Sequence, residues 1–108
     1  MEATAYDLSI QCCGKSMSNP ARGITKSGYD LNGKSREQAM TISSNDLPLG
    51  TKVYLTFDDE QYNGVYTVRD TGNMQEGVFD LYVGDFGEKV SQTAIDFGRR
   101  TVEVKVMP

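Results

Sequence analysis

Short segments in which apolar and polar residues alternate are the feature that most constrains the fold of this chain. The alternation is clearest in Thr51–Phe57 and Val78–Val83, and it returns in Thr101–Val106 near the end of the sequence. A period of two residues is typical of a β-strand that buries one face. In Val78–Val83 the apolar residues take one face, so we predict that Asp80 and Tyr82 point away from the core.

Three more strands and one hairpin follow from the same reasoning. We predict strands at Ala3–Ile10, Ala39–Ser43 and Val65–Arg69. Asn63-Gly64 readily adopts the positive φ angles of a type I′ turn. We therefore predict a tight hairpin between Thr51–Phe57 and Val65–Arg69.

Helical signals are sparse. One short helix is expected with Asp85 as its N-cap and Glu88 at the third position, and its apolar face would consist of Val90, Ala94 and Ile95. The chain has 108 residues and 11 glycines, which fits a single domain, residues 1–108, with many turns. Because closure leaves no bare strand edge, we predict an all-β fold in the form of a small closed or nearly closed β-barrel.

The segment 11–38 differs from the rest because it is rich in glycine, serine and asparagine. We predict that it is mostly loop and turn around a short Ile24-Thr25 segment. A loop of this length inside a compact domain is more often functional than idle. We expect it to form one wall of a binding groove.

The composition excludes several kinds of chemistry. The chain has no histidine, which rules out Ser-His-Asp and Cys-His catalysis and most zinc sites. Cys12 and Cys13 are adjacent, so they cannot staple a loop, and we interpret them as buried or half-buried thiols, with a redox or metal role as the alternative. The net charge is −4 and no run of Lys or Arg occurs, which disfavours nucleic acid. We expect no cofactor and no metal.

Acid–base chemistry must then come from carboxylates, Tyr, Lys or Cys. The turn after Asp70 reverses the chain, which can bring Asp70 and Asp80 to one cleft on neighbouring strands. Neighbouring carboxylates shift each other's pKa values, and such pairs cleave glycosidic bonds. Outward-facing tyrosines could stack on sugar rings. Solvated surface aspartates and ordinary strand packing are the alternatives.

Asp70-Thr71-Gly72 also matches the triplet of aspartic proteases, which pair two such aspartates in a dimer. The context differs, because Arg69 precedes the triplet and Asn73 follows it. An arginine next to the aspartate would favour a fixed negative charge over a shared proton. A dimeric aspartic protease remains an alternative.

Six segments, taken in order, resemble the 3D domain of bacterial cell-wall proteins, named for its three aspartates and found in stationary-phase survival and resuscitation-type factors. The segments are Thr4–Tyr6, Gly23–Gly28, Pro48–Tyr54, Asp70–Gly72, Phe79–Gly84 and Phe97–Val104. The resemblance implies a six-stranded double-psi β-barrel related to the catalytic domain of membrane-bound lytic transglycosylase A. It also implies a monomer that binds peptidoglycan glycan strands.

Enzymes of this kind cleave the bond between N-acetylmuramic acid (MurNAc) and N-acetylglucosamine (GlcNAc) and leave 1,6-anhydro ends. Carried over by position, Asp80 is the acid/base and Asp70 its neighbour. The expected groove residues are Thr4, Tyr6, Thr25, Ser27, Ser43, Asp46, Thr71, Gly72 and Tyr82.

The first aspartate of the family falls at Ser43, with Asp46 three residues later. Asp46 could replace the missing carboxylate, the site could work with two, or the domain could bind peptidoglycan without catalysis. No apolar stretch approaches the roughly 20 residues that span a bilayer. No secretion signal follows Met1, so we expect an extracellular or cell-wall location only if a leader has been removed.

Overall fold

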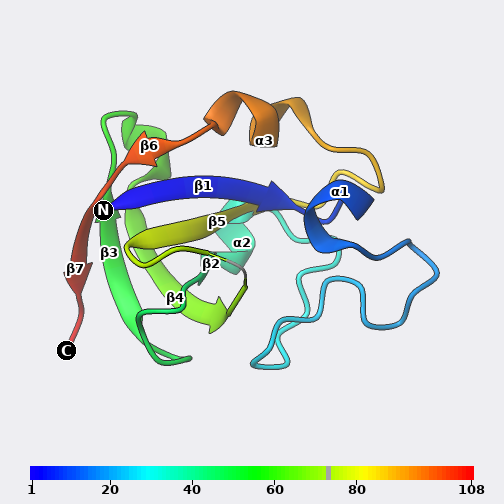
Figure 1. The fold of residues 1–108 in the computed structure, drawn as a ribbon, viewed down its shortest axis with the longest axis horizontal. Helices are drawn as coiled ribbons and strands as arrows, with labels where there is room; N and C mark the ends of the chain where they lie inside the picture. Colours follow the sequence, from blue (N-terminus) through cyan, green and yellow to red (C-terminus); the bar gives the residue numbers. More distant parts are fainter. Residues whose placement is uncertain (73) are drawn as a thin grey trace.

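The fold is a small β-barrel, seen in a computed structural model that describes residues 1–72 and 74–108 (Figure 1). Within these residues seven strands form one sheet, in the order β6-β1-β5-β2-β4-β3-β7. The strands are β1 (Glu2–Asp7), β2 (Thr41–Ser43), β3 (Lys52–Thr56), β4 (Gly64–Asp70), β5 (Val78–Gly84), β6 (Arg100–Thr101) and β7 (Glu103–Val106).

The last segment of the chain nearly closes the barrel. β6 pairs with β1 and β7 pairs with β3, and only Val102 separates β6 from β7. One continuous segment therefore joins the two ends of the sheet. The predicted all-β barrel is confirmed, and the last of the six strands implied by the resemblance is divided at Val102.

The alternating segments supply the barrel core, as predicted. The inward residues of β3 and β5 are buried, and they are Val53, Leu55, Phe79, Leu81 and Val83. Phe57, Tyr62 and Phe97 pack edge-to-face beside them, with ring centroids 5.1–6.0 Å apart. Burial of these side chains is the main force that holds the barrel together.

The predicted short helix is present, but it begins later than expected and further short helices accompany it. The described residues include three α-helices, α1 (Ile10–Cys13), α2 (Arg36–Ala39) and α3 (Gln92–Phe97), and a 3-10 helix, η1 (Glu60–Tyr62). α3 begins after Ser91, whose hydroxyl accepts a hydrogen bond from the Ala94 amide at 3.1 Å. Asp85 is not the cap, because Arg22 binds its carboxylate.

The hairpin was right in its strands and wrong in its turn. β3 and β4 pair antiparallel. Asn63 has φ −67°, however, so it does not adopt a type I′ turn. Its side-chain oxygen instead accepts a hydrogen bond from the Phe57 amide at 2.6 Å and closes a longer connection through η1. The side chain of Asn63, rather than a left-handed backbone conformation, thus stabilises the connection between β3 and β4.

The first strand is shorter than predicted because β1 ends at the buried Asp7. The Asp7 carboxylate accepts hydrogen bonds from the amides of Ser9 (2.9 Å) and Ser91 (2.7 Å). These bonds turn the chain out of the sheet, and Ser9 then caps α1.

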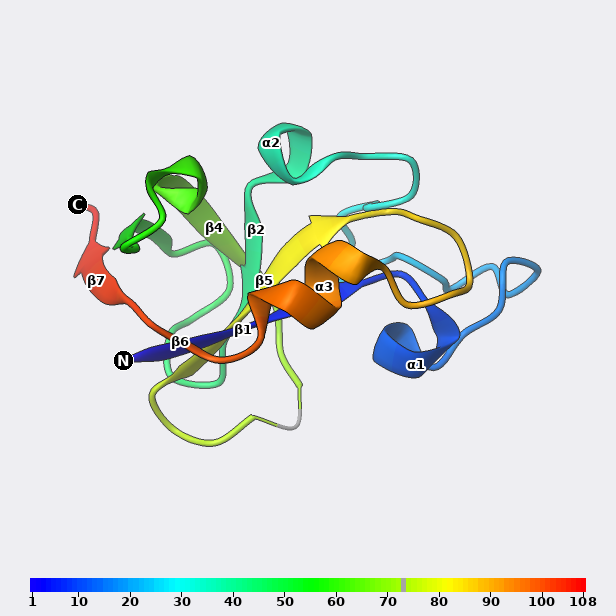
Figure 2. The same ribbon diagram turned by 90° about the horizontal axis from the view of Figure 1, so that it is seen from above.

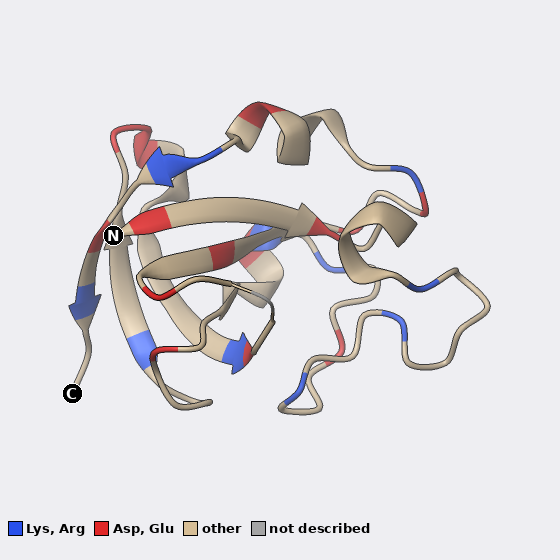
Figure 3. Ribbon diagram, viewed as in Figure 1, with Lys and Arg blue, Asp and Glu red and all other residues tan. Residues whose placement is uncertain are grey.

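The long segment 11–38 projects from the end of the barrel opposite the two termini (Figures 1 and 2). It holds five of the 11 Lys and Arg residues but two of the 15 Asp and Glu residues, so its net charge is +3 and that of the remaining residues is −7. Figure 3 shows these basic positions along the segment.

A buried ion pair attaches this segment to the barrel. The Arg22 guanidinium is 3% exposed and donates to Asp85 at 2.8 Å, and it also donates to Asn32 at 2.7 Å. The Arg22 hydrogen bond holds the pKa of Asp85 at about 2. Among the described residues, no helix has the length and apolar character needed to cross a membrane.

Candidate functional site

Four polar residues lie in one row across adjacent strands. Thr4 of β1 pairs with Asp80 of β5, Asp80 pairs with Ser43 of β2, and Ser43 pairs with Asp70 of β4. The register of the barrel therefore places Ser43 between the two aspartates. The three positions that the resemblance assigns to the family's aspartates converge, with a hydroxyl at the first of them.

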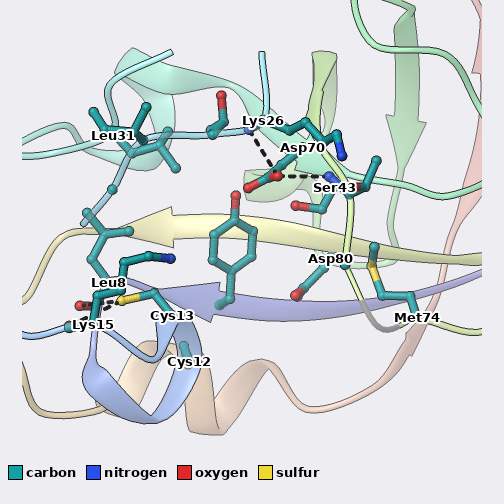
Figure 4. A pocket seen from close by; sticks show the side chains of 16 residues that line it. Leu8, Cys12, Cys13, Lys15, Lys26, Leu31, Ser43, Asp70, Met74 and Asp80 are labelled. Atoms are coloured by element: carbon teal, nitrogen blue, oxygen red, sulfur yellow. Dashed lines mark hydrogen bonds between the residues drawn. The ribbon is translucent and has the colours of Figure 1, made fainter. Parts of the chain in front are cut away.

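This row opens into a cleft of about 610 Å³ between the barrel and the long segment (Figure 4). Seven of the predicted site residues line it: Tyr6, Thr25, Ser43, Asp70, Thr71, Gly72 and Asp80. The prediction that the long segment supplies one wall agrees with this lining, because residues from Cys12 to Leu31 complete the cleft.

Asp80 has the electrostatics of a proton donor and acceptor. Its pKa is raised from 3.8 to about 6, mainly by burial and to a smaller extent by the negative charge of Asp70, while a hydrogen bond from Thr4 opposes the rise. Thr4 Oγ1 donates to Asp80 Oδ1 at 3.1 Å, which also fixes the orientation of the carboxyl group. Near neutral pH both protonation states of Asp80 are populated.

Asp70 is held differently, by backbone amides at the end of β4. Its Oδ1 accepts hydrogen bonds from the Lys26 amide at 3.1 Å and the Thr71 amide at 2.9 Å. These bonds orient the carboxylate and attach the long segment to the barrel. Arg69 does not take this role, because it donates to Thr41 Oγ1 at 2.6 Å and stacks over Tyr29 at 3.8 Å. Asn73, the residue after the Asp-Thr-Gly triplet, lies outside the described residues.

Tyr6 brings an unused hydrogen-bond donor to the cleft. Its hydroxyl oxygen is buried and has no hydrogen-bond partner among the described residues. Burial raises the pKa of Tyr6, so the phenol keeps its proton. The nearby Ser43 hydroxyl partly opposes this rise in the Tyr6 pKa, but its geometry does not complete a hydrogen bond to the Tyr6 hydroxyl. Buried donors are normally satisfied, so an unpaired one at a cleft is a candidate ligand contact.

Tyr82 points away from the barrel core, as predicted, but it is not exposed there. Its side chain is fully buried, and its hydroxyl donates to the carbonyl oxygens of Lys34 (2.7 Å) and Leu31 (3.0 Å). The long segment covers this part of β5, which the alternation pattern alone could not reveal. Tyr82 is therefore a packing residue between β5 and the segment.

Asp46 does not supply a third carboxylate to the cleft. It is exposed and absent from the cleft lining, and its Oδ2 accepts a hydrogen bond from the Gly77 amide at 2.7 Å. Thr4 and Ser27 are not among the lining residues, but each contacts one of them. Thr4 holds Asp80, and the Ser27 hydroxyl forms a 2.9 Å hydrogen bond with the hydroxyl of Thr25.

Several lining residues were not predicted from the sequence. They come from the long segment and its neighbours, and include Leu8, Cys12, Cys13, Lys15, Lys26 and Leu31. Both cysteines are free, Cys12 exposed and Cys13 half-buried. The length of the segment was the available signal, but no motif pointed to these positions. Among the described residues, no group of three or more Cys, Asp or Glu side chains could hold a metal ion.

Comparison with known proteins identifies a bacterial relative of part of this chain. No protein-family model matches the chain. It is 35% identical over 86 residues to the cell wall-binding protein YocH of Bacillus subtilis (strain 168). The match covers 79% of this chain and 26% of the relative, so the chain spans about a quarter of that protein. Over most of its length, the chain is thus similar to part of a protein named for binding the cell wall.

Proposed function

We propose that this chain is a peptidoglycan-active domain of the 3D type that cleaves the glycosidic bond between MurNAc and GlcNAc. The observation that carries the proposal is Asp80, a carboxyl group with a pKa of about 6 that lines a cleft. The similarity to a cell wall-binding protein supports a role at the cell wall, with an extracellular or cell-wall location.

The reaction needs one proton donor that later becomes a base. Protonated Asp80 gives its proton to the bridging oxygen as the bond to the muramic acid C1 breaks. The Asp80 carboxylate then takes the proton from the C6 hydroxyl of the same muramic acid, whose oxygen bonds to C1. The product carries a 1,6-anhydro ring, no water is consumed, and Asp80 is protonated again.

Asp70 and Thr4 would assist in distinct ways. The Asp70 carboxylate, oriented by two backbone amides, keeps the pKa of Asp80 high and stabilises positive charge that develops at C1. The Thr4 hydroxyl orients Asp80 and favours its ionised form after proton transfer. The hydrogen bond from Thr4 thus prepares the carboxylate for its second task.

The test is digestion of purified sacculi, followed by mass spectrometry of the released muropeptides. The wild-type protein should release muropeptides with 1,6-anhydro ends, and Asp80→Asn should release none. Reducing ends would identify a hydrolase instead. Intact sacculi in the presence of correctly folded wild-type protein would contradict the catalytic proposal.

A second candidate function is peptidoglycan binding without catalysis. It is favoured by Ser43, which places a hydroxyl where the family has its first aspartate. In that case the wild-type protein and Asp80→Asn should bind sacculi equally and release nothing. Ser43→Asp restores a third carboxylate between Asp70 and Asp80, and turnover that appears only in this variant would identify the wild type as a binding module.

A further inference from the structure

The two ends of the cleft have different chemistry. Asp80, Ser43 and Met74 lie at one end in Figure 4, and Leu8 and Lys15 lie at the other. The proposed reaction occupies the carboxylate end. It leaves the opposite end without an assigned ligand.

The opposite end combines an apolar floor with a cationic rim. Leu8 and Leu31 are 1% and 2% exposed and present aliphatic side chains to the cleft. Lys15 is half-buried at the same end, and no ion pair among the described residues involves its ammonium group. A ligand group that fits must combine a small aliphatic part with a negative charge.

The local structure fixes the position of Lys15. Gly14 ends α1 in the left-handed conformation, with φ 73°, and directs the chain toward the cleft. The Cys13 thiol then donates to the carbonyl oxygens of Leu8 (3.4 Å) and Lys15 (3.5 Å). The cysteine therefore joins the cationic rim to the apolar floor.

The two ends of the cleft also differ in charge. Asp70 and Asp80 repel an anionic ligand from the carboxylate end, whereas the long segment that forms the other wall has a net charge of +3. Two lysines line the cleft, and Lys26 lies beside Asp70, whose negative charge offsets its own. A glycan strand that places a sugar at Asp80 therefore finds the cation best separated from the carboxylates at Lys15. On muramic acid that substituent is the stem peptide, which begins with alanine and carries free carboxylates.

We propose that the Leu8–Lys15 end of the cleft binds the stem peptide, with Lys15 paired to a stem carboxylate, so that the domain prefers stem-bearing glycan to denuded glycan. This inference rests on the proposed function, because it takes a muramic acid at Asp80 as its starting point. It names the substrate class of that same site.

The test measures binding in the Asp80→Asn background, where turnover does not interfere. The probes are a MurNAc-GlcNAc tetrasaccharide with its stem peptides and the same tetrasaccharide after amidase treatment. We expect the stem-bearing probe to bind about three- to tenfold more tightly by isothermal titration calorimetry. Lys15→Met should remove this preference, and Lys15→Arg should retain it.

Lys105→Met is the matched control, because Lys105 is an exposed lysine on β7 and does not line the cleft. It should leave the preference unchanged. The inference would be overturned if both probes bound equally, if the denuded probe bound more tightly, or if neither probe bound. It would also be overturned if the preference survived Lys15→Met. Digestion of sacculi by the wild type reports separately on catalysis, so a stem preference without anhydro products would leave this inference standing while the catalytic proposal fails.

Discussion

The barrel and the long segment 11–38 form opposite walls of one cleft by different physical means. Barrel residues reach the cleft through strand register, which aligns Thr4, Asp80, Ser43 and Asp70 in one row. The long segment has little regular structure and is attached by the Arg22–Asp85 ion pair and by packing of Leu31 against Leu8 and Tyr82. In the proposed function, strand register positions the reacting groups, and a loop held by side-chain contacts positions the groups that select the ligand.

The largest expected effect tests the rigid wall. Asp80→Asn should lower kcat at least 100-fold, because general acid–base catalysis contributes roughly 10²–10⁴-fold.

The same variant should unfold at a higher temperature at pH 7. The pKa of Asp80 is about 6 in the folded protein, above the ordinary 3.8, so wild-type stability falls as the pH rises from 4 to 6. Asn cannot ionise, so the variant avoids this loss.

The stability gain should reach about 2–3 kcal/mol at pH 7 and vanish below pH 4. Thermal unfolding followed by circular dichroism at several pH values measures it. Asp58→Asn is the control, because Asp58 is exposed and distant from the cleft lining. Equal pH dependence in the wild type and Asp80→Asn would show that Asp80 is not buried in the folded state as described.

The next effect tests the attachment of the loop. Asp85→Asn removes the counter-charge of the buried Arg22 and should lower the free energy of unfolding by about 3 kcal/mol. Hydrogen exchange should show that amides in segment 11–38 lose protection before those of β3 and β5. Uniform loss of protection would contradict the separation between barrel and segment. Because the folded pKa of Asp85 is about 2, the wild type should lose this stabilisation as the pH falls from 4 to 2.

Removing the hydroxyl group from Tyr82 or from Tyr6 should change the stability by smaller and opposite amounts. Tyr82→Phe loses the hydrogen bonds that join β5 to the segment, and should lower the free energy of unfolding by about 1–2 kcal/mol. Tyr6→Phe removes a hydroxyl without a partner, so stability should stay constant or rise by up to about 1 kcal/mol. Urea denaturation measures both. A marked loss of stability in Tyr6→Phe would mean that its hydroxyl supports the fold.

The smallest effects are opposite shifts in the pH dependence of activity. Asp80 must be protonated for the first step, so kcat should fall as the pH rises through about 6. Thr4→Val removes a hydrogen bond that favours ionised Asp80, so the pH at which kcat falls should rise by about half a unit. Asp70→Asn removes a negative charge that favours protonated Asp80, so the same pH should drop by about half a unit. Shifts in the same direction would contradict these roles.

The sequence predicted the barrel better than the loop, for a physical reason. Alternation identified β3 and β5 because one face of each strand is buried, and the distant Asp70 and Asp80 were expected to share a cleft before the register was known. The burial of Tyr82 was missed because its cover comes from residues 48 to 51 positions earlier in the chain. Asp85 was misplaced likewise, since Arg22 competes for the carboxylate that would otherwise cap a helix. Contacts of this kind leave no periodic pattern in the sequence.

The positions of Lys15 and Cys13 in the cleft lining were also beyond sequence reasoning. Their place in the cleft depends on how α1 ends at Gly14 and on the way the segment folds back over β5. Ser43, by contrast, was identified by its position relative to the family pattern, and its register between the two aspartates gives that position a structural meaning.

The proposed function depends on Asp80 being a buried carboxyl group able to exchange a proton near neutral pH. Nuclear magnetic resonance of the aspartate side-chain carboxyl carbons, with the Asp80 signal assigned by its loss in Asp80→Asn, measures this directly. We predict a titration midpoint near pH 6 in the wild type. A midpoint near 4, the ordinary value for a solvated aspartate, would contradict the account.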